Sequence, residues 1–173
     1  MNIAALPDTQ PYRLSPARQE DVAPVATLLQ ANTASQGGAL NGEFPDAKVA
    51  QMLLGQGAYA VVARREDQVV GVLFSTTSLA AAPAVIKDML AAWPAGKQCW
   101  IYGPACVSAS ERGRGLLTLL YAALRQHYGA KPPVLFINAT NESSRRAHER
   151  LGMHRVADFT SGGQQLQVYT SLA

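Results

Sequence analysis

Residues 105–120, ACVSASERGRGLLTLL, decide the fold class. The stretch begins apolar, passes through a short basic segment with two glycines, and ends in a leucine-rich run. This pattern predicts a strand up to Ser108, a turn, and a helix over 113–128 whose leucines and tyrosines recur at helical spacing. The first N–H groups of a helix lack internal partners, and the helix dipole adds partial positive charge there. Glycines at 113 and 115 and arginines at 112 and 114 therefore predict a pyrophosphate site.

Other interpretations of the turn are weaker. RGRG alone fits an ordinary tight turn with two solvated arginines, but the flanking strand and helix favour an anion site. A dinucleotide site of the Gly-x-Gly-x-x-Gly type lacks its third glycine and the acidic residue expected about 20 positions later. A P-loop is excluded because its Gly-Lys-Ser/Thr ending is absent.

Outside this stretch, strands and helices alternate along the chain. We expect a hairpin of strands 59–64 and 69–76, a last helix over 143–151 that ends at Gly152, and a bulge or a sheet edge at Gly103-Pro104. The other expected strands are 12–14, 98–108, 134–138, 154–159 and 165–170, and the other expected helices are 18–31, 49–53 and one within 78–96. This order predicts an α/β fold with a single-domain mixed sheet flanked by helices over residues 1–173, with 1–11 as a loose arm.

The composition indicates a compact globular protein. Of the 173 residues, 48% are hydrophobic, yet no run approaches the ~18 apolar residues of a membrane helix. No secretory signal is apparent at the start, so we expect a cytoplasmic protein. Cys99 and Cys106 share one expected strand on opposite faces, roughly 23 Å apart, which excludes a bridge between them. No metal-type cluster surrounds them, and core residues are favoured over a catalytic cysteine.

Charge is unevenly distributed. Between Glu111 and Arg155 there are eight basic and three acidic residues, a net charge of +5, within a chain of net charge +3. Such a local field suits a polyanionic ligand, although a solvated helix surface also fits it. Nucleic acid is disfavoured as a partner because the arginines lack interleaved exposed aromatic residues.

Two spaced motifs resemble one known family. The first is Arg/Gln-x-x-Gly-x-Gly/Ala after a strand, matched from Arg112 through Leu117, with leucine at the last position. The second is Asn141, Ser144, His148 and Gly152-Met153 at the family's spacing, with histidine where tyrosine is usual and methionine where phenylalanine is common. On these residues the chain resembles the GNAT superfamily of acyl-CoA-dependent N-acyltransferases, over roughly 12–169.

The resemblance implies a fold with splayed central strands and a site for acetyl-CoA (coenzyme A). The pantetheine arm would pair with backbone of the earlier strand, and Asn141 and Ser144 would contact the arm from its other side. The residues implied for the arm on that strand are Ala105, Cys106 and Val107. Those implied for the pyrophosphate are Arg112, Gly113, Arg114, Gly115, Leu116 and Leu117.

The resemblance also implies direct attack of a neutral amine on the thioester. Val107 N–H is the candidate oxyanion donor and His148 the candidate acid, with a packed helix histidine as the alternative. A base could be Tyr102, or Glu43 through water, although core packing and solvation also explain these residues. We expect an N-acetyltransferase for a primary amine of a small molecule. A protein N-terminal or lysine acetyltransferase and a non-catalytic acyl-CoA-sensing module stay open, and the resemblance implies a homodimer.

Overall fold

The computed structural model describes residues 10–80 and 82–173. These described residues form two compact units, one from residues 10–75 and 103–127 and the other from 76–80, 82–102 and 128–173. The seven strands have the order β1-β2-β3-β4-β5-β7-β6 in a mixed sheet, which confirms the predicted α/β fold class. Among these residues no helix combines the length and apolar character that a membrane span requires.

The first unit contains three antiparallel strands, β1 (Arg13–Pro16), β2 (Val61–Arg65) and β3 (Gln68–Thr76), and the second half of β4 (Trp100–Val107). Its helices are α1 (Val22–Gln30), α2 (Asp46–Leu54) and most of α4 (Leu116–Tyr128), with short 3-10 turns at Gln19–Asp21, Ala34–Gln36 and Ala109–Glu111. The β2–β3 hairpin turns at Glu66 and Asp67, both with positive φ, as a tight hairpin turn requires. The predicted hairpin is therefore confirmed.

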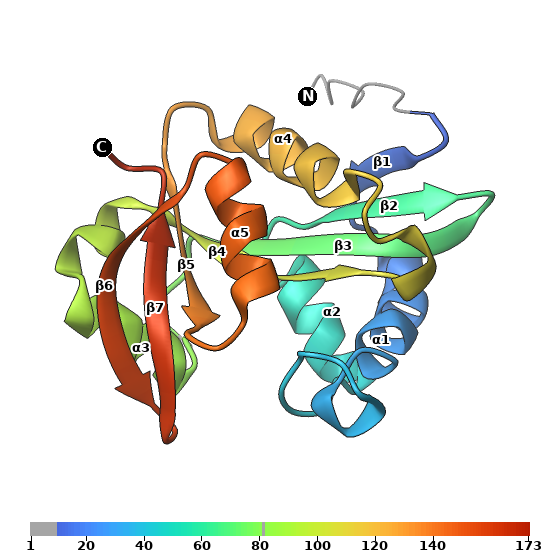
Figure 1. Cartoon of the computed structure of the whole chain (residues 1–173). Helices are drawn as coiled ribbons and strands as arrows, with labels where there is room; N and C mark the ends of the chain where they lie inside the picture. Colours follow the sequence, from blue (N-terminus) through green and yellow to red (C-terminus); the bar gives the residue numbers. More distant parts are fainter. Residues whose placement is uncertain (1–9, 81) are drawn as a thin grey trace. The chain divides into compact units, whose positions relative to one another are not determined.

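Two apolar layers hold the first unit together. On one face, Val25, Val49, Val62, Val72 and their neighbours form a buried cluster beneath α1 and α2. On the other face α4 packs against β3, where a side chain at Gly71 would meet Leu116 at 3.0 Å and Leu120 at 3.3 Å. This close packing places the start of α4 firmly against the strands (Figure 1).

The second unit contains the first half of β4 together with β5 (Pro133–Asn138), β6 (His154–Ser161) and β7 (Gln164–Thr170). The β4–β5 pairing is parallel and covers Trp100 and Ile101, a short register that fits splayed central strands. The other pairs in this unit are antiparallel. Helix α3 (Ala84–Ala92), followed by a 3-10 turn at Pro94–Gln98, supplies Met89 and Leu90 to a core shared with β5, β6 and β7. The remaining helix is α5 (Glu142–Arg150), which ends before Gly152 with φ +92°, as predicted.

Three expectations require correction or comment. Helix α4 begins at Leu116 and not at 113, because Gly113 and Gly115 have positive φ and cannot continue a right-handed helix. Gly103-Pro104 does not mark a sheet edge, because β4 lies between β3 and β5 in the strand order; its peptide bond is cis. The predicted arm at 1–11 lies outside the described residues except for its last two positions.

Candidate functional site

The turn before α4 is an open backbone surface. Gly113 has φ +76° and Gly115 has φ +78°, a conformation that favours glycine. A Cβ built at either position would meet no atom within 4 Å, so both glycines face open space. The predicted phosphate turn therefore has the backbone freedom and the room that a bound anion needs.

Free N–H groups lie at the same place. The first hydrogen bond at this end of α4 runs from the Leu119 N–H to the Gly115 carbonyl at 3.3 Å. The N–H groups of Leu116, Leu117 and Thr118 consequently have no partner within the helix. α4 is 13 residues long, so its dipole adds partial positive charge at these donors. The turn and the helix start can together bind a pyrophosphate group.

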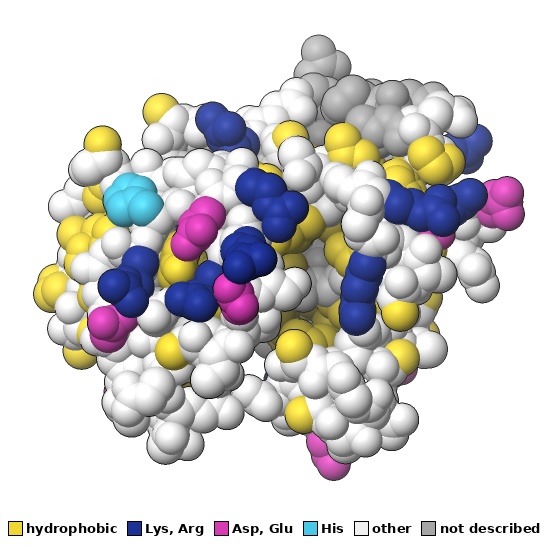
Figure 2. Space-filling view, in the orientation of Figure 1, with side chains coloured by type: hydrophobic (Ala, Val, Ile, Leu, Met, Phe, Trp, Pro, Cys, Tyr) yellow, Lys and Arg dark blue, Asp and Glu magenta, His cyan; other side chains and the backbone are white. Residues whose placement is uncertain are grey.

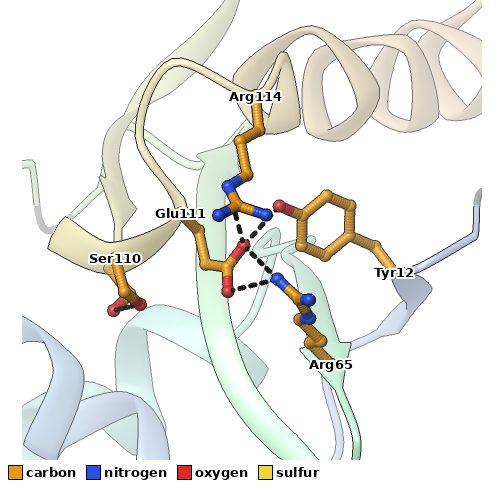
Figure 3. Close-up of polar contacts among 6 residues, drawn as sticks. Tyr12, Arg65, Ser110, Glu111 and Arg114 are labelled. Carbon is orange, nitrogen blue, oxygen red and sulfur yellow. Dashed lines mark hydrogen bonds and ion pairs between the residues drawn. The ribbon is translucent and has the colours of Figure 1, made fainter.

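A buried carboxylate anchors the turn. Glu111 is only 5% exposed, and its Oε2 accepts a 2.5 Å hydrogen bond from the Tyr12 hydroxyl. Arg65 donates through Nη1 to both carboxylate oxygens, at 3.0 and 3.2 Å, and Arg114 Nε lies 3.8 Å from Oε2 (Figure 3). The Tyr12 hydrogen bond and then Arg65 hold the pKa of Glu111 below its usual range, while the same bond raises the pKa of Tyr12. The carboxylate is thus ionised at neutral pH.

This cluster was not predicted from the sequence. Glu111 entered only as one of three acidic residues in a basic stretch, and Tyr12 only as the start of a strand. The available signal was position: a single carboxylate directly precedes the arginine and glycine turn. Its partners lie 99 and 46 residues away, beyond the reach of any local pattern.

The two arginines of the turn have different surroundings. Arg112 Nη2 donates to Asn32 Oδ1 at 2.7 Å, and Asn32 Nδ2 donates to the Leu28 carbonyl at 2.8 Å. The Asn32 carbonyl also accepts from the Leu40 N–H, so Arg112 links the turn to the end of α1 and to the glycine-containing loop at 35–46. Arg114 is about half exposed, and its Nε lies 3.8 Å from Glu111 Oε2. Arg112 is therefore held by a hydrogen bond to Asn32, whereas Arg114 makes a longer ion pair with Glu111.

Side-chain burial alternates along the strand segment before the turn. Cys106 is buried in the apolar cluster beneath α1 and α2, whereas Ala105 and Val107 are half-buried. Burial raises the pKa of the Cys106 thiol to about 11. Both cysteines are buried free thiols, which confirms the core interpretation, and a neutral Cys106 thiol does not suit a nucleophile. Because the Cys106 side chain is buried, a ligand at this position could contact only its backbone.

Tyr102 and His148 form a hydrogen-bonded pair in the second unit. The Tyr102 hydroxyl lies 2.9 Å from His148 Nε2, and both side chains are buried. His148 Nδ1 lies 2.7 Å from the Ser144 carbonyl, which can only accept, so Nδ1 carries the proton and Nε2 accepts from Tyr102. Burial lowers the pKa of His148, against a smaller opposing effect of the Ser144 carbonyl. The neutral imidazole is therefore the form present near neutral pH.

The remaining predicted residues have simpler surroundings. Asn141 caps α5, with its Oδ1 accepting from the Ser144 N–H at 3.1 Å. Glu43 is exposed; its carbonyl accepts from Lys48 Nζ at 2.9 Å, and its carboxylate makes no hydrogen bond or ion pair within residues 10–80 and 82–173. Basic side chains gather over α5, with acidic ones among them (Figure 2). One such pair is Arg146–Glu142 at 2.6 Å, so part of the basic stretch is a solvated helix face.

No protein-family model matches the sequence. No curated protein matches it either. Solved structures do match along nearly the whole chain. A proposed acetyltransferase of the GNAT family from Desulfovibrio desulfuricans is 16% identical with a TM-score of 0.68, covering 92% of this chain and 97% of the other. The proposed acetyltransferase yncA of Salmonella typhimurium, solved with its cofactor acetyl-CoA, is 17% identical with a TM-score of 0.67, covering 93% of each chain. The chain has the GNAT acetyltransferase fold.

One of the matching structures has a named acceptor. The ribosomal-protein-S18-alanine N-acetyltransferase of Escherichia coli is 13% identical with a TM-score of 0.67, covering 94% of this chain and 96% of the other. At identities of 13–17% the similarity shows a shared fold, and a shared fold does not determine the acceptor.

Proposed function

We propose that the protein is an acyl-CoA-dependent N-acetyltransferase that acetylates a primary amine of a small molecule. The observation that carries this proposal is the turn at 112–115. Two glycines with positive φ face open space directly before the free N–H groups of α4, within a GNAT fold. A pyrophosphate group fits these donors, and two arginines add positive charge beside them.

Acetyl-CoA would supply the activated acetyl thioester. Backbone N–H groups of residues 112–117 would hold its pyrophosphate, and the backbone at Ala105, Cys106 and Val107 would pair with the pantetheine arm. The burial of the Cys106 side chain supports a backbone role there, since its thiol lies within the core. Asn141 and Ser144 are further candidates for the arm, and the side chain of Asn141 already serves as the cap of α5.

Proton handling is assigned to Tyr102 and His148. Because Nδ1 is committed to the Ser144 carbonyl, the basic lone pair of His148 is on Nε2 and faces the Tyr102 hydroxyl. When a proton reaches the Tyr102 oxygen, the phenolic proton can pass to Nε2 of His148. The reverse transfer can then return a proton through Tyr102 to a departing thiolate. The lowered pKa of His148 supports this order, in which the imidazole first receives a proton and then returns it. Exposed Glu43 is a second candidate base.

The second candidate acceptor is the N-terminal amine of a protein. The similarity to a ribosomal-protein alanine N-acetyltransferase favours this alternative over a lysine acceptor. A homodimer follows from the resemblance to the family and stays a proposal.

Ligand-dependent thermal stability tests the cofactor. Acetyl-CoA or CoA should raise Tm, by an amount corresponding to about 2.7 kcal/mol at 100 times Kd, whereas NAD and ATP should not. A panel of small amines and of peptides with free N-termini, with released thiol as the readout, then separates the two acceptor classes. A shift with NAD and none with CoA would contradict the acetyltransferase proposal.

A further inference from the structure

We propose that Glu111 is a positioning residue that holds the turn and directs Arg114 toward the pyrophosphate of CoA. This inference rests on the proposed function. It begins with the physical chemistry of a carboxylate that is 5% exposed. Such a group costs free energy unless donors and opposite charges compensate it. Tyr12, Arg65 and Arg114 supply that compensation from three separate segments.

The position of Glu111 in the chain transmits this anchoring to the ligand site. Glu111 is the last residue of the 3-10 turn at 109–111 and directly precedes residues 112–117, whose backbone would meet the phosphates. Tyr12 belongs to the segment entering β1 and Arg65 ends β2, so two strands of the first unit hold one end of the turn. The other end is fixed by α4, through Leu116 against Gly71. Between these fixed ends lie the two glycines, which would otherwise give the turn wide conformational freedom.

The orientation of Arg114 is the second consequence. Arg114 Nε lies 3.8 Å from Glu111 Oε2, and the half-exposed Arg114 side chain stays accessible to a further acceptor (Figure 3). The single negative charge of Glu111 is shared between Arg65 and Arg114, so the cluster keeps a net charge of +1. Glu111 therefore orients Arg114 without cancelling its attraction for an anion. Arg112 differs from Arg114, because its Nη2 already donates to Asn32 Oδ1.

The test compares ligands that share the pyrophosphate. Glu111→Gln keeps the shape of the side chain but removes its charge. By isothermal titration, CoA, 3′-dephospho-CoA and inorganic pyrophosphate should each bind roughly 10-fold more weakly to this variant. The loss should shrink to about 2-fold in an Arg114→Ala background, because the two residues act together. Glu142→Gln, which breaks an exposed glutamate–arginine pair on α5, is the matched control and should bind as the wild type does.

A purely structural role predicts a different pattern. In that case Glu111→Gln would lower Tm, and its effect on CoA affinity would simply add to that of Arg114→Ala. Such additivity would overturn the proposal. Unchanged CoA affinity in a folded Glu111→Gln protein would overturn it as well. Should Glu111→Gln not fold, Tyr12→Phe removes one donor to the carboxylate. It should weaken pyrophosphate by about 3-fold and again show coupling to Arg114→Ala; additivity there overturns the proposal. If the wild type binds no CoA, the proposed function itself fails, and the role of Glu111 with it.

Discussion

Helices α4 and α5 begin in opposite ways. α4 follows two glycines with positive φ, and its first N–H groups are left without partners in the helix. α5 follows Asn141, whose side chain accepts the Ser144 N–H. Both helices lie in the basic stretch and both have a glutamate close to their start. The difference indicates that a helix start is available to an anion only where the chain's own side chains leave its donors free.

The glycine at the start of α4 provides the most severe test of this comparison. Gly115→Val should weaken CoA binding about 100-fold or more, equivalent to about 2.8 kcal/mol, because a branched side chain would fill the open space before the free N–H groups. Isothermal titration measures the loss. Gly152→Val is the matched control: Gly152 also has positive φ and open space around it, but it follows the end of α5.

Each of the two variants should lose stability, by about 1–2 kcal/mol, since valine is disfavoured at positive φ. Only the variant at 115 should lose CoA. Equal CoA affinity in the two folded variants would place the phosphate site elsewhere.

Substitutions at His148 test the role of the buried side of α5. His148→Ala should lower kcat by about 10- to 1,000-fold with little change in CoA affinity, because the pair with Tyr102 handles a proton and not the phosphates. His148→Tyr should recover much of that activity, since a phenol can also exchange a proton. The exposed His154 provides the control variant His154→Ala, which should keep wild-type turnover.

The pH dependence follows from the direction of the pKa shift. Burial lowers the pKa of His148 below its ordinary value near 6.5, so the receptive neutral form persists at neutral pH. The kcat of the wild type should decline only as the pH falls through this lowered value, and the acidic limb should be lost in His148→Ala. Full turnover in that variant, with chemistry rate-limiting, would make His148 a structural residue.

The smallest expected effect concerns the cap of α5. Asn141→Ala leaves the Ser144 N–H without its acceptor and should cost about 1 kcal/mol in the free energy of unfolding, measured with urea. Ser143→Ala, at the exposed position next to Ser144, is the control and should change stability much less. A loss below about 0.3 kcal/mol would show that the cap contributes little, and would weaken the contrast with α4.

Local sequence patterns were sufficient to predict the strand–turn–helix unit around residue 112, the β2–β3 hairpin, the last helix with Gly152 after it, and the burial of both cysteines. These features are set by local physical chemistry. Apolar spacing distinguishes helix from strand, and glycine marks positive φ. The start of α4 was misplaced by three residues because helical spacing of leucines does not reveal where left-handed glycines interrupt the helix.

The partners of the charged and titratable side chains, by contrast, follow from long-range packing. Tyr12 and Arg65 meet at Glu111, Arg112 is bound by Asn32, and Tyr102 faces His148. The partners in these contacts are 46 to 99 residues apart. Neither periodicity nor motif spacing extends across such distances in sequence. The Tyr12 hydrogen bond and Arg65 keep Glu111 ionised, and burial keeps His148 neutral; both effects depend on which distant segments pack around these residues.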